Sequence, residues 1–307
     1  MGRGCDEQPF VVNTFPGFPL GLLYALGSPV YFILFHVVRW RRDQVASDIA
    51  QAFPEMPAAE RAEVLRQSYR NLVDVVMEAL WGFGAGADEL KRRVTFENTE
   101  IIDRAADAKQ SVVVLAPHFC NWEWLLLAAG ARFGIPIDAV YQRQRFASLD
   151  RFLTAARSRF GGKPIAREDF VYELMSRAGT PRAYALVADQ TPPRGDKKHW
   201  TRLLNRDTAF FVGAEKVARF LDAPVLYVGM RRLSRGHYAV YFTALATPPY
   251  AWEGEVDDVP IMELFARTLE TAVRESPADW LWVQKRWKYP KPADWKDAGR
   301  RRPIPEP

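Results

Sequence analysis

Between residues 94 and 243, short apolar runs alternate with amphipathic segments along the chain. The run at residues 111–116 is rich in β-branched side chains and has no polar face, which is typical of a strand covered on both sides. The segments between such runs carry apolar residues at helical spacing. This alternation predicts an α/β fold: a single domain with a mixed, largely parallel central sheet flanked by helices.

The individual elements follow from the same periodicities and from turn residues. Strands are predicted at residues 94–98, 111–116, 137–141, from about 162, 184–188, 224–231 and 238–243. Helices are predicted at residues 43–53, 58–80, 101–109, from about 122, 149–160, 170–178, from about 212 and 259–275. The last two strands are expected to pair around residues 234–237. Residues 81–86 and the stretch just before 212 are expected to be loops.

The N-terminal part of the chain has a different character. No Asp, Glu, Lys or Arg occurs between residues 9 and 38. Residues 20–38 are long enough to cross a bilayer, which takes a helix of ~20 residues. Arg39, Arg41 and Arg42 come directly afterwards, and the positive-inside rule would place the rest of the chain in the cytoplasm. We favour a membrane anchor, either spanning or lying in the interface, over a buried core helix.

Composition supports a folded protein with a short flexible end. Of the residues, 48% are hydrophobic and 26% are charged, which is typical of a globular chain. We therefore divide the sequence into an N-terminal hydrophobic anchor with its basic flank (residues 1–42), a globular domain (43–289) and a tail rich in Pro and charge (290–307). The tail is predicted to be disordered.

Charge and cysteine content narrow the possible functions. The net charge is 42 − 37 = +5, which suits an anionic partner such as lipid head groups, an acidic carrier protein or nucleic acid. No nucleic-acid-binding module is recognisable, and the apolar N-terminus argues against that partner. The two cysteines, Cys5 and Cys120, form no disulfide framework or zinc pattern, and the histidines show no metal-ligand spacing.

The strongest chemical signal is the pair His118 and Glu123. Residues five apart on one helix point roughly 140° away from each other at ~100° per residue, so the two side chains meet only if His118 lies in the turn before the helix. Glu123 would then accept one ring N–H and leave the other nitrogen as a proton acceptor. Helix N-terminal N–H groups would lie close to a developing oxyanion. The alternative is a capping histidine with a first-turn carboxylate favoured by the helix dipole.

Other polar residues come after later strands of the predicted sheet. Asp189 and Gln190 come directly after the strand at 184–188, where open α/β sheets place their sites, although Asp189 could also be a plain turn residue. Arg143 and Arg145 follow the strand at 137–141 in the same way. We expect all four side chains to contribute to substrate binding.

Three further features have competing interpretations. Residues 279–289 are aromatic and basic; we favour a membrane-interface or head-group role that includes Arg286 over simple packing. Arg151, Arg157 and Arg159 are interpreted as a solvated helix face. Cys120 lies close to His118, but a small buried cysteine is more common than a nucleophile.

The segment APHFCNWEW at residues 116–124 resembles the corresponding segment of the bacterial lipid A late acyltransferases (the lauroyl/myristoyl transferase family). Its H-x4-E spacing is similar to the H-x4-D/E motif of glycerolipid acyltransferases. VADQTPPRG at 187–195 resembles the family's ADQ segment, and the resemblance covers about residues 20–288. One departure is Val140-Tyr141-Gln142-Arg143, where the family often has Val-Tyr-Arg/Lys-Pro, so Arg143 or Arg145 is expected to supply the displaced cation.

The resemblance implies an O-acyltransferase at the cytoplasmic side of the inner membrane, without a cofactor or metal. It would move a fatty acyl chain from acyl carrier protein to a hydroxyl of a lipid A precursor. His118 would be the general base with Glu123 as its partner, and substrate contacts are expected from Asn121, Arg143, Arg145, Asp189, Gln190 and Arg286. The alternatives are acyl-CoA as donor, or a lysophospholipid, glycolipid or aminolipid as acceptor. A non-catalytic membrane protein that binds anionic lipid is the alternative of another class.

Overall fold

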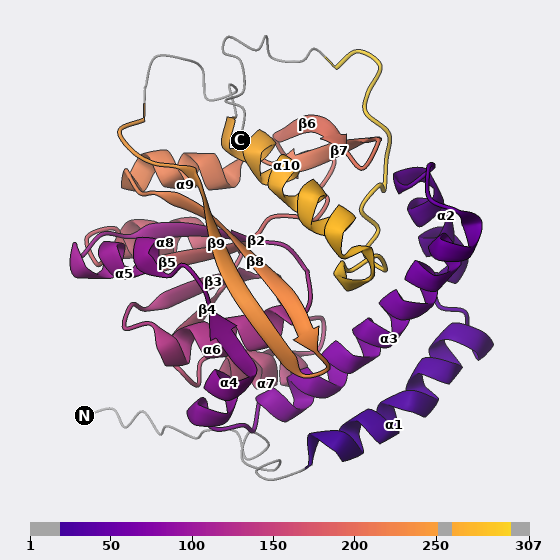
Figure 1. Ribbon diagram of the computed structural model, residues 1–307. Helices are drawn as coiled ribbons and strands as arrows, with labels where there is room; N and C mark the ends of the chain where they lie inside the picture. Colours follow the sequence, from indigo (N-terminus) through magenta and orange to yellow (C-terminus); the bar gives the residue numbers. More distant parts are fainter. Residues whose placement is uncertain (1–18, 251–259, 296–307) are drawn as a thin grey trace.

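The computed structural model describes residues 19–250 and 260–295, and it is built around one central sheet (Figure 1). The sheet has seven strands in the order β1-β9-β8-β2-β5-β3-β4. All neighbouring strands are parallel except β8 and β9, which pair antiparallel. The predicted α/β fold with a mixed, largely parallel sheet and flanking helices is therefore confirmed.

The element bounds agree with most of the predicted ones. The strands are β1 (Val94–Phe96), β2 (Val112–Ala116), β3 (Ile137–Tyr141), β4 (Gly162–Ala166), β5 (Ala183–Val187), β6 (Lys198–Leu203), β7 (Arg206–Phe211), β8 (Val225–Ser234) and β9 (His237–Ala246). The helices are α1 (Leu20–Phe32), α2 (Arg42–Ala52), α3 (Ala58–Gly82), α4 (Ala87–Arg93), α5 (Glu100–Asp107), α6 (Trp122–Arg132), α7 (Ala147–Arg157), α8 (Phe170–Arg177), α9 (Gly213–Leu221) and α10 (Pro260–Glu275). A π-helical turn, Ile33–Val37, continues α1, and a short 3-10 turn, Pro277–Asp279, follows α10.

Helices cover both faces of the sheet. Helices α9 and α10 contact β2, β8 and β9 on one face, whereas α6 contacts β1 and β4 and packs with α4 and α7 on the other (Figure 1). The core is continuous across the sheet because β2 is fully apolar and buried along its length. This double coverage is what a continuous β-branched run predicts.

Two elements differ from the sequence-based prediction. The stretch before residue 212, predicted as a loop, contains the hairpin β6–β7, whose turn residues Leu204 and Asn205 both have positive φ. Such two-residue turns usually carry glycine, and its absence hid the hairpin. Helix α4 follows the glycines of residues 82–86 and is only two turns long, too short to show a periodicity.

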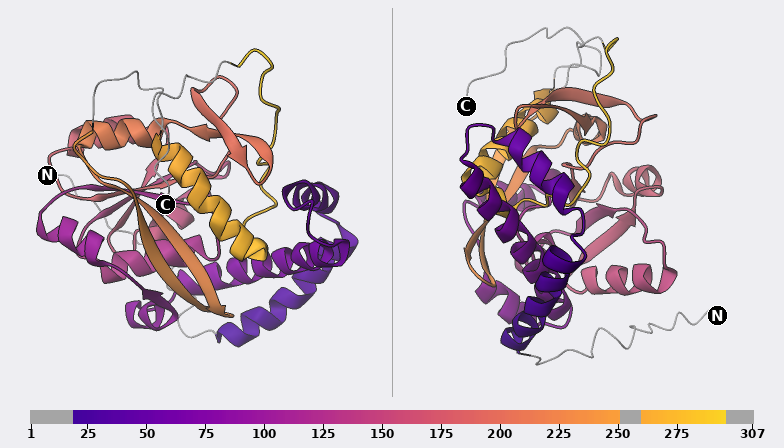
Figure 2. Two further views of the ribbon diagram at one scale, coloured as in Figure 1. Left: turned by 45° about the horizontal axis from the view of Figure 1, so that its top comes forward. Right: turned by 90° about the vertical axis from the view of Figure 1, so that its right-hand side faces the viewer.

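The apolar N-terminal helix lies along α3 (Figure 2). Leu20, Leu23 and Gly27 are its buried residues, and a Cβ on Gly27 would lie 3.2 Å from the Val73 side chain. Within the described residues, Leu20–Val37 is the one helix long and apolar enough to cross a membrane, and only 22% of it is buried. This exposure contradicts a buried core helix. Residues 1–18 of the predicted anchor and 296–307 of the predicted tail lie outside the described residues.

The contact between α3 and α6 depends on a glycine. A Cβ on Gly82 would lie 2.3 Å from Nε1 of Trp124, which is fully buried and donates a hydrogen bond to the Glu78 carbonyl. Any side chain at position 82 would therefore push α6 away from α3 and stretch this hydrogen bond.

Gly82→Ala is expected to lower the free energy of unfolding by about 1–3 kcal/mol, because overpacking forces buried groups to shift. Gly134→Ala is the matched control, since a Cβ there meets nothing within 4 Å. Urea unfolding of the purified variants measures both effects. Equal stability of the two variants would contradict the close packing of Trp124 on α3.

Candidate active site

The parallel pairing of β2 and β5 brings His118 and Asp189 together. Ala116 and Val187, the last residues of the two strands, are partners in the register, and each functional residue lies two positions beyond. His118 Nδ1 lies 2.7 Å from Asp189 Oδ1, and the His118 backbone N–H donates to Oδ2 at 3.0 Å. The carboxylate on the imidazole is therefore Asp189 and not the predicted Glu123.

Asp189 is completely buried and well supplied with donors. Its Oδ2 also accepts hydrogen bonds from Trp280 Nε1 at 2.9 Å and from Gln284 Nε2 at 3.1 Å. Burial alone would raise the pKa of Asp189, but the adjacent His118 ring and the hydrogen bonds from His118 and Trp280 hold it at about 2. An ionised Asp189 favours the tautomer in which Nδ1 carries the ring proton, and this leaves Nε2 as an acceptor.

The C-terminal segment fixes the loop that carries His118. The His118 carbonyl accepts from the Leu281 N–H at 3.0 Å, and the Cys120 N–H donates to the Asp279 carbonyl at 2.9 Å. Cys120 has a φ of +50°, and its thiol donates to the Met230 carbonyl. Burial raises the pKa of this thiol well above its ordinary value, which argues against a nucleophilic thiolate.

Glu123 binds an arginine instead of the histidine. Arg157, at the end of α7, donates from Nε to Oε2 at 2.9 Å and from Nη2 to Oε1 at 2.5 Å. Both side chains are largely buried, so the prediction of Arg157 as part of a solvated face is wrong. Burial alone would lower the pKa of Arg157, but its hydrogen bonds and ion pair with Glu123 raise it. Glu123 lies in the first turn of α6, which contacts α7, and the helix packing therefore pairs it with Arg157.

His118 opens into a cavity of about 620 Å³ between α6 and the sheet. Glu123, Arg157 and Gln190 line its mouth with His118, and the Gln190 amide nitrogen lies 3.4 Å from His118 Nε2. The Trp122 ring packs edge-on against the imidazole with centroids 5.2 Å apart. His118 Nε2 therefore faces this space, with the Gln190 amide beside it.

Small side chains on one face of the sheet create the cavity. Successive strand residues alternate between faces, and the alternate positions Ala116, Ala139, Ala183 and Ala185 all line it. The interior is otherwise apolar, and its far end holds three packed aromatic rings. Ring centroids lie 5.1 Å apart for Phe96 and Phe133, 6.1 Å for Phe133 and Phe242, and 6.4 Å for Phe96 and Phe242. The shape and lining suit a long apolar ligand with its reactive end at His118.

Two predicted substrate-binding residues are buried away from the cavity. Asn121 is fully buried and caps α6, since its Oδ1 accepts the Trp124 N–H at 2.9 Å. Arg286 is 2% exposed, donates to the Ala209 carbonyl and stacks over Phe210, and burial lowers its pKa to about 10. A direct substrate contact is not open to either side chain, because neither reaches solvent or the cavity.

The remaining predicted residues lie at the surface or in the core. Arg143 lines the cavity mouth and pairs with Asp169 at 2.5 Å, and Arg145 is exposed nearby. Trp280 and Trp282 are buried, so the aromatic segment packs in the core. It also donates a hydrogen bond to Asp189 through Trp280. Among the described residues, no group of three or more His, Cys, Asp or Glu side chains could hold a metal ion.

The sequence analysis does not predict the His118–Asp189 contact, although the sequence places both residues just after predicted strands. Both residues lie just beyond the carboxyl ends of predicted parallel strands, His118 two residues after the strand at 111–116 and Asp189 directly after the strand at 184–188. The sequence does not tell which strands are neighbours, and strand order alone decides whether such residues meet. The contributions of Trp280 and Gln284 have no local signal, because they come from the far end of the chain.

Comparison with known proteins gives the class to which this fold and site belong. The family described as "Bacterial lipid A biosynthesis acyltransferase" matches residues 11–289. The chain therefore belongs to this family and is an O-acyltransferase.

Individual relatives are distant. A lipid A biosynthesis acyltransferase of Haemophilus influenzae is 25% identical over 46% of this chain and 44% of its own length. Lipid A biosynthesis acyltransferase 2 of Shigella flexneri is 23% identical over 91% of both chains. A lipid A biosynthesis myristoyltransferase of Escherichia coli is 22% identical over 82% of this chain and 77% of its own.

Asp189→Asn is expected to change both stability and its pH dependence. The pKa of about 2 lies below the ordinary 3.8, so ionisation of Asp189 stabilises the fold above about pH 4, and this contribution is lost as pH falls towards 2. It amounts to about 2 kcal/mol. The stability difference between wild type and Asp189→Asn should shrink by this amount between pH 6 and pH 2, measured by urea unfolding. A difference that does not vary with pH would contradict the assignment.

Proposed function

We propose that this protein transfers a fatty acyl chain from acyl carrier protein to a hydroxyl of a lipid A precursor, with His118 as the general base. The observation that carries this proposal is the imidazole held by a buried, ionised Asp189 at the mouth of an apolar cavity. Family membership supports the reaction class, and the names of the relatives support a lipid A precursor as acceptor.

The chemistry needs one base and a place for the acyl chain. In the proposed reaction, His118 Nε2 takes the proton of the acceptor hydroxyl, and the oxygen attacks the thioester carbonyl. The tetrahedral intermediate collapses, the C–S bond breaks, and the imidazolium returns the proton to the leaving thiolate. Asp189 keeps the ring oriented and stabilises its positive charge, as the acid does in a Ser-His-Asp triad.

Glu123 has a revised role in this proposal. By holding Arg157 at the cavity mouth, it would place a cation close to the developing oxyanion, with the N-terminus of α6 nearby. Gln190 would contact the reacting groups beside His118 Nε2. Arg143 and Arg145 at the rim suit an anionic head group of the acceptor.

Helix α1 supports attachment to a membrane. Its buried side faces α3, and its exposed side is apolar. The exposed residues include Leu22, Leu26, Val30 and Phe32, followed by Ile33 and Val37 of the π-helical turn. A helix held along the protein surface in this way suits insertion into the interface better than crossing of the bilayer. We propose that the protein acts at the cytoplasmic side of the inner membrane, where its acyl donor would be available.

The first test is mass spectrometry of total lipid, including lipid A, from cells that lack the protein. The cells are complemented with wild type, His118→Ala, Glu123→Ala or Asp189→Asn. Only the wild type should restore an acyl chain to lipid A, because general-base catalysis contributes about 10²–10⁴-fold. Folding of each variant is checked by circular dichroism. A folded His118→Ala protein with wild-type turnover would disprove the assignment of the base.

The same experiment decides the acceptor. Loss of the chain from a lysophospholipid, glycolipid or aminolipid product in place of lipid A would move the activity to that lipid. Purified enzyme assayed with an acyl-carrier-protein thioester and with the acyl-CoA of equal chain length decides the donor.

Ala185→Leu is expected to shift the preferred acyl chain to a shorter one, because the larger side chain enters the cavity wall. Phe133→Leu should allow a longer chain by opening the far end. The matched control is Ala147→Leu, which adds the same atoms at an exposed position. Competition among thioesters of different lengths, read by mass spectrometry of the product, measures the preference. An unchanged preference in both cavity variants would exclude the cavity as the acyl site.

A further inference from the structure

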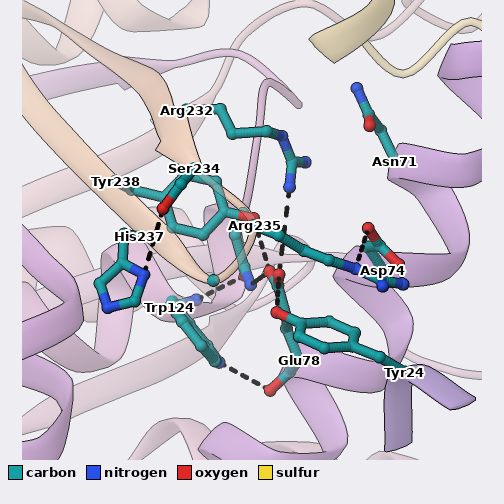
Figure 3. Close-up of polar contacts among 12 residues, drawn as sticks. Tyr24, Asn71, Asp74, Glu78, Trp124, Arg232, Ser234, Arg235, His237 and Tyr238 are labelled. Atoms are coloured by element: carbon teal, nitrogen blue, oxygen red, sulfur yellow. Dashed lines mark hydrogen bonds and ion pairs between the residues drawn. The ribbon is translucent and has the colours of Figure 1, made fainter. Parts of the chain in front are cut away.

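A second buried carboxylate, Glu78 of α3, lies outside the proposed chemistry and has no exposed surface. Its Oε1 accepts a hydrogen bond from the Tyr24 hydroxyl at 2.6 Å. Its Oε2 accepts from the Tyr238 hydroxyl at 2.5 Å and from Asn121 Nδ2 at 2.7 Å. The donors come from α1, β9 and the start of α6, so one side chain joins three separate elements to α3. Figure 3 shows Tyr24 and Tyr238 next to Glu78.

A carboxylate is costly to bury unless donors and a counter-charge surround it. Glu78 has three donors, and Arg232 Nη1 lies 4.0 Å from its Oε1. Arg232 in turn donates from Nε to Asp279 at 2.9 Å, the residue whose carbonyl holds the Cys120 N–H. The surroundings of Glu78 are therefore continuous with the contacts that fix the loop of His118.

Asn121 is the link between Glu78 and the proposed active site. It stands between His118 and Glu123 in the sequence, and both ends of its side-chain amide are used. Oδ1 caps α6 through the Trp124 N–H, while Nδ2 donates to Glu78. Trp124 also donates from its indole to the Glu78 carbonyl at 2.7 Å. Glu78 therefore fixes the first turn of α6 at two points.

The apolar helix α1 reaches the same carboxylate through Tyr24. The guanidinium of Arg235 lies 3.8 Å from the centre of the Tyr24 ring and pairs with Asp74 through two hydrogen bonds of 2.8 and 2.5 Å. This arrangement holds the Tyr24 hydroxyl against Glu78 (Figure 3). The position of α1 on α3 is thus connected to the loop of His118 by two hydrogen bonds.

We propose that Glu78 is a positioning residue for acyl transfer: through Asn121 it sets the geometry of the His118 loop and of the first turn of α6, and Tyr24 makes α1 part of this support. The inference rests on the proposed function, because the group that it positions is the proposed base. Glu78 itself touches neither substrate nor reacting atoms.

The test is a cycle of Glu78→Gln, Asn121→Asp and the double variant in the full-length protein. Each single change should lower kcat by about tenfold with an unchanged KM for the acyl-carrier-protein thioester, since small displacements of catalytic groups are costly. In the double variant the amide is at position 78 and the carboxylate at position 121, so the hydrogen bond between the two side chains forms again in the opposite direction. The carboxylate at position 121 also remains an acceptor for the Trp124 N–H. The double variant should therefore recover most of kcat, and failure to recover would overturn the proposal.

A second measurement does not depend on turnover. Diethyl pyrocarbonate modifies Nε2 of His118, and mass spectrometry of the peptide that contains His118 follows the rate of modification. The single variants should change this rate about threefold and the double variant should restore it, because the loop moves and returns. If wild type transfers no acyl chain but these rates change as expected, the proposed function fails and the positioning role stands. Unchanged rates in Glu78→Gln would disprove the role.

Two control variants, Glu263→Gln and Tyr250→Phe, separate positioning from a general loss of stability. Glu263→Gln alters another buried carboxylate, which accepts from His199 and Thr201 away from the cavity, and should leave kcat and the His118 rate unchanged. Tyr24→Phe removes only the α1 hydroxyl and should lower kcat about threefold, whereas Tyr250→Phe, which loses a hydrogen bond to Ala223, should not. If Glu78→Gln does not fold, the Tyr24→Phe and Tyr250→Phe pair decides: equal kcat values would overturn the proposal.

Discussion

Because β2 and β5 are hydrogen-bonded neighbours in parallel register, the residues just beyond them emerge at the same edge of the sheet and meet there. The contact between His118 and Asp189 is a direct result, and it places a charged carboxylate in the interior. An interior charge must be satisfied by donors from the surrounding chain. The C-terminal segment supplies them through Trp280 and Gln284, so the last part of the chain closes around a contact that the sheet topology creates.

The cavity is a second consequence of the sheet. A parallel sheet normally packs large branched residues against the covering helices, whereas here four alanines, Ala116, Ala139, Ala183 and Ala185, lie among the larger residues of the face below α6. The space that they leave has an apolar interior and a polar mouth. In the empty protein the atoms that line this space lack van der Waals contacts on one side, and a long apolar ligand in the cavity would supply them. The same strand ends therefore supply both the proposed base and the entrance to the cavity.

Helix α3 connects the apolar helix α1 to the loop that carries His118. Three of its polar residues, Asn71, Asp74 and Glu78, lie at helical spacing and engage the C-terminal segment, Arg235 and Asn121 respectively. A polar row with two carboxylates on the buried side of a helix is unusual, and here each member has a partner from a distant part of the chain. The site is consequently supported from the side that carries α1.

Most of the elements, the α/β class and the proposed base could be predicted from local sequence. Periodicity and the residues at strand ends were enough, because strand formation, helix formation and the corner at His118 depend on neighbours in the chain. The partners of the site residues depended on tertiary structure: Asp189 for His118, Arg157 for Glu123, and burial in place of substrate contact for Asn121 and Arg286. Strand order and helix packing bring together residues that are 34 to 71 positions apart, and no local pattern encodes those contacts.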